Sequence, residues 1–198
     1  MPRASELLNR LMEMPENENF SVGDFVTQLG SRSFVLAILI FALPHSVPLP
    51  EPPGLSTITA LPVLFMAAQI VIGRQTIWLP KSIARKHISQ KSIKGIIRKV
   101  LSLIIWLERF MHSRWPFLYG AFGQRTIGFL IFLMALILAL PIPGGNFLPG
   151  LSISFLALAL LEGDGAFTLF SVLFSAASFY VMYQLVILAA SELIKYLL

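Results

Sequence analysis

The sequence predicts an all-α integral membrane protein, built as a small helical bundle, and three observations carry this prediction. Of the 198 residues, 56% are hydrophobic and 13% are charged, against about 45–50% and about 25% in soluble domains. The mean hydropathy of +0.78 leaves too little polar surface to cover a soluble fold of this size. The apolar residues also gather in runs of helical length. These observations exclude an ordinary cytosolic enzyme, a disordered chain and a nucleic-acid-binding protein.

Residues 1–30 precede the first long apolar run and predict two short amphipathic helices. Apolar side chains at 7, 8, 11 and 12 share one helical face, and a second helix begins near Ser21 and stops at Gly30. This segment lacks the apolar core and cleavage site of a secretory signal. We expect both helices to lie on the membrane surface or against the bundle.

Residues 31–73 predict a first pair of helices separated by a break. The run at 33–43 stops at Pro44 after about eleven residues, whereas a spanning helix needs about 20. The run at 55–73 is long enough to span, with a kink at Pro62 and a buried polar side chain at Gln69. Residues 44–54 between the two runs are named here the first break.

Residues 74–125 form the basic centre of the chain. They contain eleven Lys or Arg residues and a single acidic residue, Glu108. Short basic loops stay in the cytoplasm during insertion, so the sequence places this loop there, with an interfacial helix around 100–107. The lysines and arginines at 81–99 either bind anionic lipid headgroups or serve as a topology signal alone.

Residues 126–162 predict a second pair of the same kind, followed by one plain transmembrane helix. The run at 126–140 ends at Pro141, and a second run covers 150–161. Residues 141–149 between them are named the second break. The uncharged run at 166–190 is the one full-length transmembrane helix predicted with no interruption. Together these segments form a single membrane domain over residues 1–198.

The two pairs look like an internal repeat. The first reads ALP at 42–44, eight residues, then PGLS at 53–56; the second reads ALP at 139–141, seven residues, then PGLS at 149–152. This predicts two repeated helix–break–helix hairpins, which either cross the membrane and return or are re-entrant. The alternative is that both breaks are simple corners whose loops lie at the surface.

Broken helices offer a way to bind an anion inside a membrane. A Pro-Gly break frees backbone N–H groups, and the helix that follows carries a partial positive charge at its start. Serines 56 and 152 are expected near these starts. Intramembrane ionisable groups are candidates for coupling or ion pairing. The predicted substrate-binding residues are Gly54, Ser56, Asn146, Gly150, Ser152, Arg32, Arg74 and Arg125, and the predicted coupling or ion-pair residues are Glu51, Glu162 and Asp164.

Two polar features allow more than one interpretation. The EGDG sequence at 162–165 is either a tight turn or a carboxylate source for Arg74 or Arg125 beside a substrate path. His45 is either a proton relay or a bystander at the start of a loop. No phosphate loop, HExxH motif or catalytic triad pattern occurs, and we expect no catalytic residue, metal or cofactor.

Several motifs together resemble the exopolysaccharide synthesis protein ExoD family. They occur in order along both halves of the chain, over roughly residues 20–195. The resemblance implies a bacterial inner-membrane protein linked to exopolysaccharide synthesis, and it implies no catalytic residue. The motif residues are Pro48, Pro50, Pro53, Gly54, Ser56, Gln69, Gly73, Arg74 and Trp78-Leu79-Pro80 in the first half, and Leu140-Pro141-Ile142-Pro143, Asn146, Pro149 and Glu162-Gly163-Asp164-Gly165 in the second.

These observations lead to a multi-pass inner-membrane protein that binds and translocates an anionic lipid or lipid-linked precursor. A polyprenyl phosphate satisfies both the exopolysaccharide link and the anion-binding helix ends. The main alternative is a scaffold that transports nothing and holds polysaccharide-synthesis proteins together; a membrane enzyme acting on lipid phosphates is a weaker one. The expected partners are membrane lipids and polysaccharide-synthesis proteins, with no nucleic acid, and a homodimer would help to bury the polar breaks.

Overall fold

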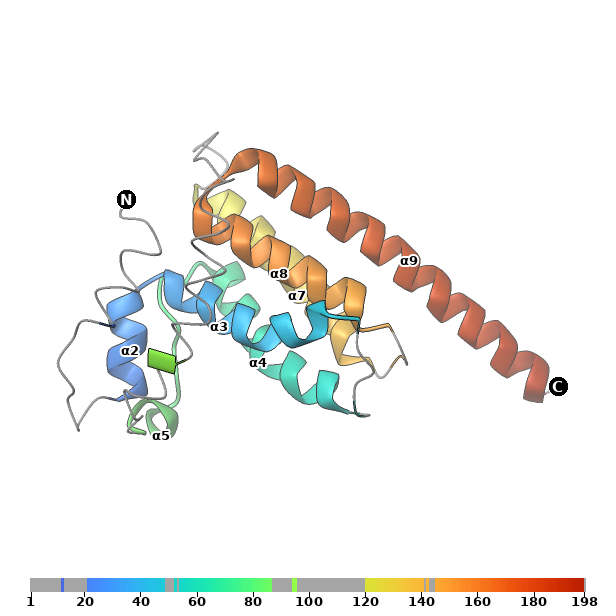
Figure 1. The fold of residues 1–198 in the computed structure, drawn as a ribbon, viewed down its shortest axis with the longest axis horizontal. Coiled ribbons are helices and arrows are strands. Elements are labelled where there is room, and N and C mark those ends of the chain that lie inside the picture. Colours follow the sequence, from blue (N-terminus) through green and yellow to red (C-terminus); the bar gives the residue numbers. More distant parts are fainter. Residues whose placement is uncertain are drawn as a thin grey trace.

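The computed structural model is a bundle of helices, and it has no β-strand in the part of the chain that it describes (Figure 1). That part comprises residues 12, 21–48, 52, 54–86, 94–95, 120–140, 142 and 145–197. The elements are α2 (Val22–Leu29), α3 (Arg32–Ala42), the short 3₁₀ helix η1 (Leu43–Ser46), α4 (Leu55–Ile72), α5 (Lys81–Ala84), α7 (Ala121–Ala139), α8 (Phe147–Glu162) and α9 (Gly165–Leu197).

Three helices are long and apolar enough to cross a membrane: α4, α7 and the Gly165–Leu188 part of α9. This agrees with the predicted multi-pass membrane protein. The helix α7 begins at Ala121, five residues before the predicted boundary at 126, because the helix continues through Gln124 and Arg125 beyond the apolar run. The apolar helix α8 has 16 residues, and α3 has 11.

Each helix of the first predicted pair packs against a helix of the second pair. Helix α4 makes its most extensive contact with α7, and α3 packs on α8. At one end of the bundle the Thr57 hydroxyl of α4 donates to the carbonyl of Ala139, the last residue of α7 (2.9 Å). At the other end Gly128 of α7 lies against Ile70 of α4. These two contacts show that α4 and α7 run antiparallel.

Both breaks therefore lie at the same end of the bundle, which is named here the break end. The opposite end is named the basic end and carries α2 and α5, where the Val22 N–H donates to the carbonyl of Lys86 (3.0 Å). Figure 1 shows α2 and α5 together at that end, and it shows α9 continuing past the rest of the bundle toward the C-terminus.

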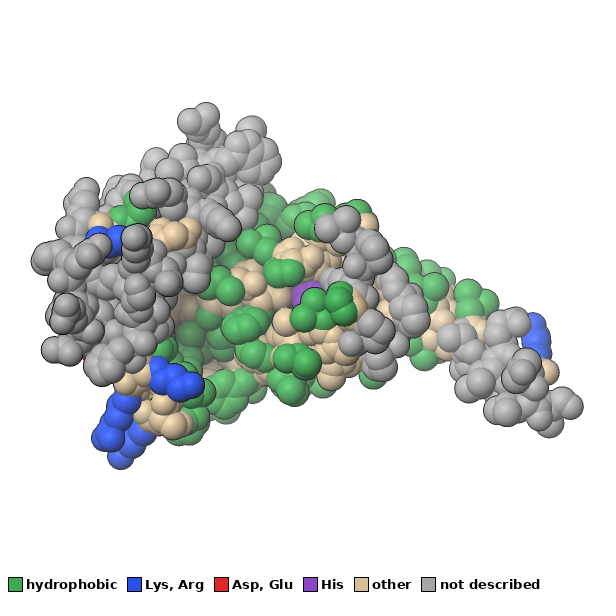
Figure 2. All heavy atoms as spheres, turned by 60° about the horizontal axis from the view of Figure 1, so that its bottom comes forward, with side chains coloured by type: hydrophobic (Ala, Val, Ile, Leu, Met, Phe, Trp, Pro, Cys, Tyr) green, Lys and Arg blue, Asp and Glu red, His purple; other side chains and the backbone are tan. Residues whose placement is uncertain are grey.

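Apolar side chains fill the interior and also cover the outside. Ile38, Leu39, Ile131 and Leu138 are completely buried, while many Phe, Leu and Ile side chains are exposed, some of them on the face that Figure 2 shows. A soluble protein of this size rarely exposes so much contiguous apolar surface. Lipid tails are the solvent that suits such an exterior.

The close contact between α4 and α7 depends on a glycine. A Cβ atom at Gly128 would lie 2.6 Å from Ile70 Cγ2 and 2.9 Å from its Cβ, both shorter than any ordinary contact. We therefore expect Gly128→Ala to destabilise the bundle by about 1–3 kcal/mol, as overpacked cores do. A thermal unfolding scan of the protein in detergent measures this.

Gly95→Ala is the matched control, because nothing lies within 4 Å of a Cβ at that position. Equal melting temperatures of the Gly128→Ala and Gly95→Ala proteins would contradict the close packing of α4 on α7 at Gly128.

Candidate functional site

Hydroxyl side chains tie the two breaks to each other. The Ser46 and Ser154 hydroxyl oxygens lie 2.8 Å apart, which joins η1 to α8. Ser46 also donates to the carbonyl of Ala42 in the last turn of α3 (3.1 Å). Together with the bond from Thr57 to Ala139, this links each hairpin to the other through side chains at the break end.

His45 lies at the centre of this junction and is completely buried. Its Nε2 lies 2.6 Å from the Thr59 hydroxyl, and that hydroxyl is also in hydrogen-bonding range of the carbonyls of Leu55 and Ser56. Because carbonyl oxygens only accept, a Thr59 hydroxyl that donates to them accepts from a protonated Nε2. This arrangement selects the imidazole form that carries hydrogen on Nε2.

Gly150 lets α8 approach the histidine closely. A Cβ atom there would lie 2.6 Å from His45 Cβ and 2.9 Å from its carbonyl carbon. Because part of this obstacle is backbone, no rotamer change of the histidine would relieve it. The predicted binding residue Gly150 thus has a direct structural role: it makes room for the first break.

The two breaks differ in how the following helix begins. At the first break, Gly54 takes a left-handed conformation (φ 86°) and precedes α4, so buried Ser56 lies in the first turn as predicted. At the second break, α8 already begins at Phe147. The predicted break of 141–149 is therefore too long at its C-terminal side.

The early start of α8 changes the position of Ser152. This serine follows the first turn instead of starting the helix, and its hydroxyl donates to the carbonyl of Leu148 (2.8 Å). Helix α8 can start before Pro149 because proline is tolerated in the first turn of a helix, where its missing N–H would have no intrahelical partner. Asn146 stands before the helix and makes no side-chain cap.

The predicted arginines lie away from the breaks. Arg32 is the first residue of α3, Arg74 follows the C-terminal end of α4, and Arg125 lies near the start of α7. The 18 residues of α4 put about 27 Å between Ser56 and Arg74. The structure thus divides the predicted binding residues between two ends of the bundle and does not join them in one site.

The EGDG sequence forms a turn between α8 and α9. Gly163 ends α8 in a left-handed conformation (φ 66°), and the buried Asp164 carboxylate accepts from the N–H groups of Ala166 and Phe167 (2.9 and 3.2 Å). The EGDG sequence is thus a turn in the structure. The coupling or ion-pair role of Glu162 and Asp164 stays a prediction, and Glu51 lies outside the described residues.

Gln69 and Trp78 explain another pair of the motif residues. The Gln69 side-chain oxygen accepts from the backbone N–H of Trp78 (2.6 Å). The indole ring of Trp78 contacts the Phe65 ring, with ring centroids 6.2 Å apart. These contacts hold the segment that follows α4 against the side of α4. Gln69 is buried, as predicted, and its polar atoms are used within the protein.

Sequence reasoning missed most of the junction. The sequence allows either a proton relay or a bystander at His45, and it does not indicate a role for the hydroxyls of Ser46, Thr57, Thr59 and Ser154. The available signal was the density of hydroxyl residues immediately after each break in an otherwise apolar sequence. In chemical terms the junction offers hydroxyl groups and one imidazole as hydrogen-bonding groups.

The cysteine-free chain allows a direct check of the junction. Because the Ser46 and Ser154 oxygens are 2.8 Å apart, we expect Ser46→Cys with Ser154→Cys to form a disulfide under mild oxidation. Maleimide-polyethylene glycol added after denaturation should then label neither cysteine, and it should label both after reduction. Each single-cysteine variant is a control and should stay labelled. Full labelling of the oxidised double variant would contradict the junction.

Comparison with known proteins gives consistent matches. The family model described as "Exopolysaccharide synthesis, ExoD" matches residues 4–184. The uncharacterized protein slr1875 of Synechocystis is 34% identical over 157 residues, which cover 77% of this chain and 74% of that protein. Protein ExoD of Rhizobium meliloti is 28% identical over 165 residues, covering 81% and 68% respectively. No solved structure matches. The chain belongs to the ExoD family of exopolysaccharide synthesis proteins.

Proposed function

We propose that this protein binds an anionic lipid or lipid-linked precursor, such as a polyprenyl phosphate, and moves it across the bacterial inner membrane. The family description and the name of the Rhizobium relative link such proteins to exopolysaccharide synthesis. An anionic headgroup that crosses the membrane must pass through hydrocarbon, where a charge is costly without polar partners.

The junction of the two breaks is the observation that supports this proposal most directly. It concentrates an imidazole and several hydroxyls within an apolar bundle, at His45, Thr59, Ser46 and Ser154. The helices α4 and α8 start beside it, and a helix start carries backbone N–H groups without intrahelical acceptors. Pro149 supplies no such group, and the N–H groups of Leu55 and Gly150 already donate to the carbonyls of Pro52 and Asn146. The other N–H groups of these helix starts attract an anion through the helix dipoles.

The length of α9 supports a location of the junction below the membrane surface. A Cβ at Gly145, in the second break, would lie 2.8 Å from Met182 Cε, so α9 passes the break end near Met182. Its apolar span continues to Leu188, which is about 9 Å further along the helix. Hydrocarbon that covers this continuation also surrounds the breaks.

The charge pattern sets the orientation within this proposal. Lys81, Arg85 and Lys86 are exposed at the basic end, and short basic loops remain in the cytoplasm. The break end then faces the periplasmic half of the membrane. The C-terminal end of α9 lies on that side as well.

Transport is tested with the purified protein in liposomes that contain fluorescently labelled polyprenyl phosphate. Dithionite bleaches the label in the outer leaflet only, so movement of lipid appears as additional bleaching. We expect the unaltered protein to move the label and His45→Ala to slow it about tenfold or more, since the junction loses its imidazole. Leu173→Ala, at an exposed site on α9, should match the unaltered protein.

No movement by the unaltered protein, with or without a proton gradient, would contradict transport. The scaffold alternative has its own support, because the junction hydroxyls already bond within the protein. It becomes the better account if transport is absent and a glycosyltransferase of polysaccharide synthesis co-purifies with the His45→Ala variant as well as it does with the unaltered chain.

The depth of the break end is tested separately with spin labels. A nitroxide attached at Leu185→Cys should collide readily with oxygen and poorly with a water-soluble nickel chelate, because hydrocarbon surrounds that turn of α9. Leu173→Cys, at an exposed site on the part of α9 beside the bundle, is the control in hydrocarbon, and Ser191→Cys should show the reverse preference. A strong nickel effect at position 185 would place the breaks at the water surface.

A further inference from the structure

The basic end contains a second arrangement suited to an anion, built on Gly73. This glycine ends α4 in a left-handed conformation (φ 87°), which disfavours any other residue. The Arg125 guanidinium occupies the place of the missing side chain, since a Cβ at Gly73 would lie 2.6 Å from one of its terminal nitrogens and 2.9 Å from Nε. Gly73 therefore seats the Arg125 guanidinium against the end of α4, at the residue that precedes Arg74.

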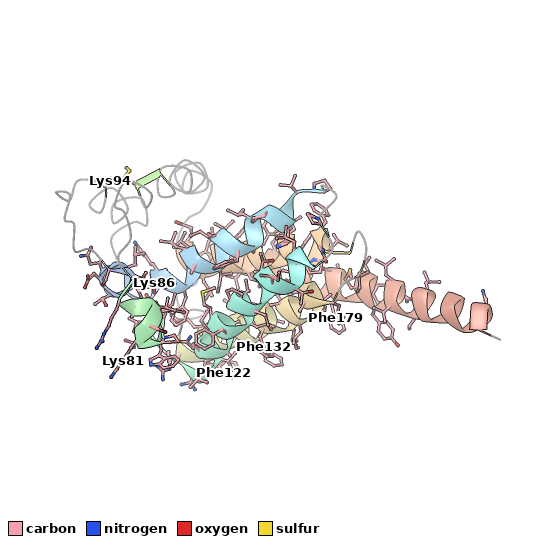
Figure 3. All side chains as sticks on the ribbon, turned by 90° about the horizontal axis from the view of Figure 1, so that it is seen from below. Lys81, Lys86, Lys94, Phe122, Phe132 and Phe179 are labelled. Atoms are coloured by element: carbon pink, nitrogen blue, oxygen red, sulfur yellow. The ribbon has the colours of Figure 1, made fainter. Side chains whose placement is uncertain are left out.

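The two arginines have no carboxylate to neutralise them in the described part of the chain. Both side chains are exposed, so their charges face the surroundings. Further exposed cations lie at the same end, where Figure 3 shows Lys81 and Lys86 on and beside α5. An anion that approaches this end meets a field of one sign.

Apolar side chains flank the arginines and narrow the choice of ligand. Ile72, which precedes Gly73, is 71% exposed, and Phe122, the second residue of α7, is 84% exposed. Trp78, held by Gln69, is also half exposed, as is typical of side chains at a membrane interface. Free phosphate would use only the arginines, whereas a lipid would use the apolar flank as well.

We propose that Arg74 and Arg125 bind the phosphate headgroup of an anionic membrane lipid in the leaflet at the basic end. The guanidinium groups provide paired N–H donors for phosphate oxygens, and Ile72 and Phe122 contact the chains. This site lies about 27 Å from the break junction, judged by the 18 residues of α4. It does not depend on transport, so failure of the transport assay leaves this proposal standing.

Trp78 serves as the reporter for this site. The changes Trp106→Phe and Trp115→Phe leave Trp78 as the only tryptophan in the chain. The full-length protein is placed in nanodiscs with brominated phosphatidic acid or, for comparison, brominated phosphatidylcholine at the same density. We expect stronger quenching of Trp78 by the brominated phosphatidic acid, because it gathers at the neighbouring arginines.

The variants separate a site from a general surface charge. Arg74→Gln with Arg125→Gln should lower the preference for phosphatidic acid about 30-fold, since two bases near a membrane contribute roughly 1 kcal/mol each. The matched control, Arg85→Gln with Lys86→Gln, removes the same charge from the α5 region and should keep most of the preference. Circular dichroism and gel filtration check that each variant is folded.

Three outcomes would overturn the proposal. Equal losses in both double variants would show a diffuse field without a site. An unchanged preference in the Arg74/Arg125 variant would place the lipid elsewhere. Complete competition by millimolar inorganic phosphate would assign the site to free phosphate, whereas a lipid site keeps its quenching under those conditions.

Discussion

The approach of Gly150 to His45 is the contact on which the arrangement of the bundle depends. It puts the start of α8 directly on the backbone of η1, at a distance that no larger residue allows. With that contact made, Ser46 reaches Ser154 and α3 lies along α8. Because α3 leads into the first break, this contact holds the C-terminal end of α3 beside the start of α8.

That contact also gives the two hairpins a common orientation. Antiparallel packing of α4 on α7 and of α3 on α8 puts both breaks at one end and both sets of free helix termini at the other. An inverted arrangement of the two hairpins would instead put the breaks at opposite ends. Any polar group that the breaks supply therefore acts from one side of the molecule.

Apolar run length predicted the main helices because hydrocarbon imposes a long apolar stretch on any spanning helix. Thus α4 and the start of α9 follow the sequence closely. The start of α7 was placed too late because the polar Gln124 and Arg125 hide a helical turn, and Ser152 was placed too near a helix start because proline fits the first turn of α8. Side-chain pairs such as Ser46 with Ser154 join residues over a hundred positions apart, and no local pattern in a single sequence specifies them.

The separation of charge from the breaks constrains how a phosphate could pass through this molecule. Arg74 and Arg125 lie at the end of α4 and the start of α7, where water and lipid headgroups can solvate them. The described residues of the junction offer neutral donors and His45 in their place. A fixed cation there would need a permanent counter-ion within hydrocarbon, and it would hold a phosphate too tightly to release it. Hydroxyls and an imidazole bind an anion more weakly, which suits the proposed transport, since a phosphate that is carried across must also be released.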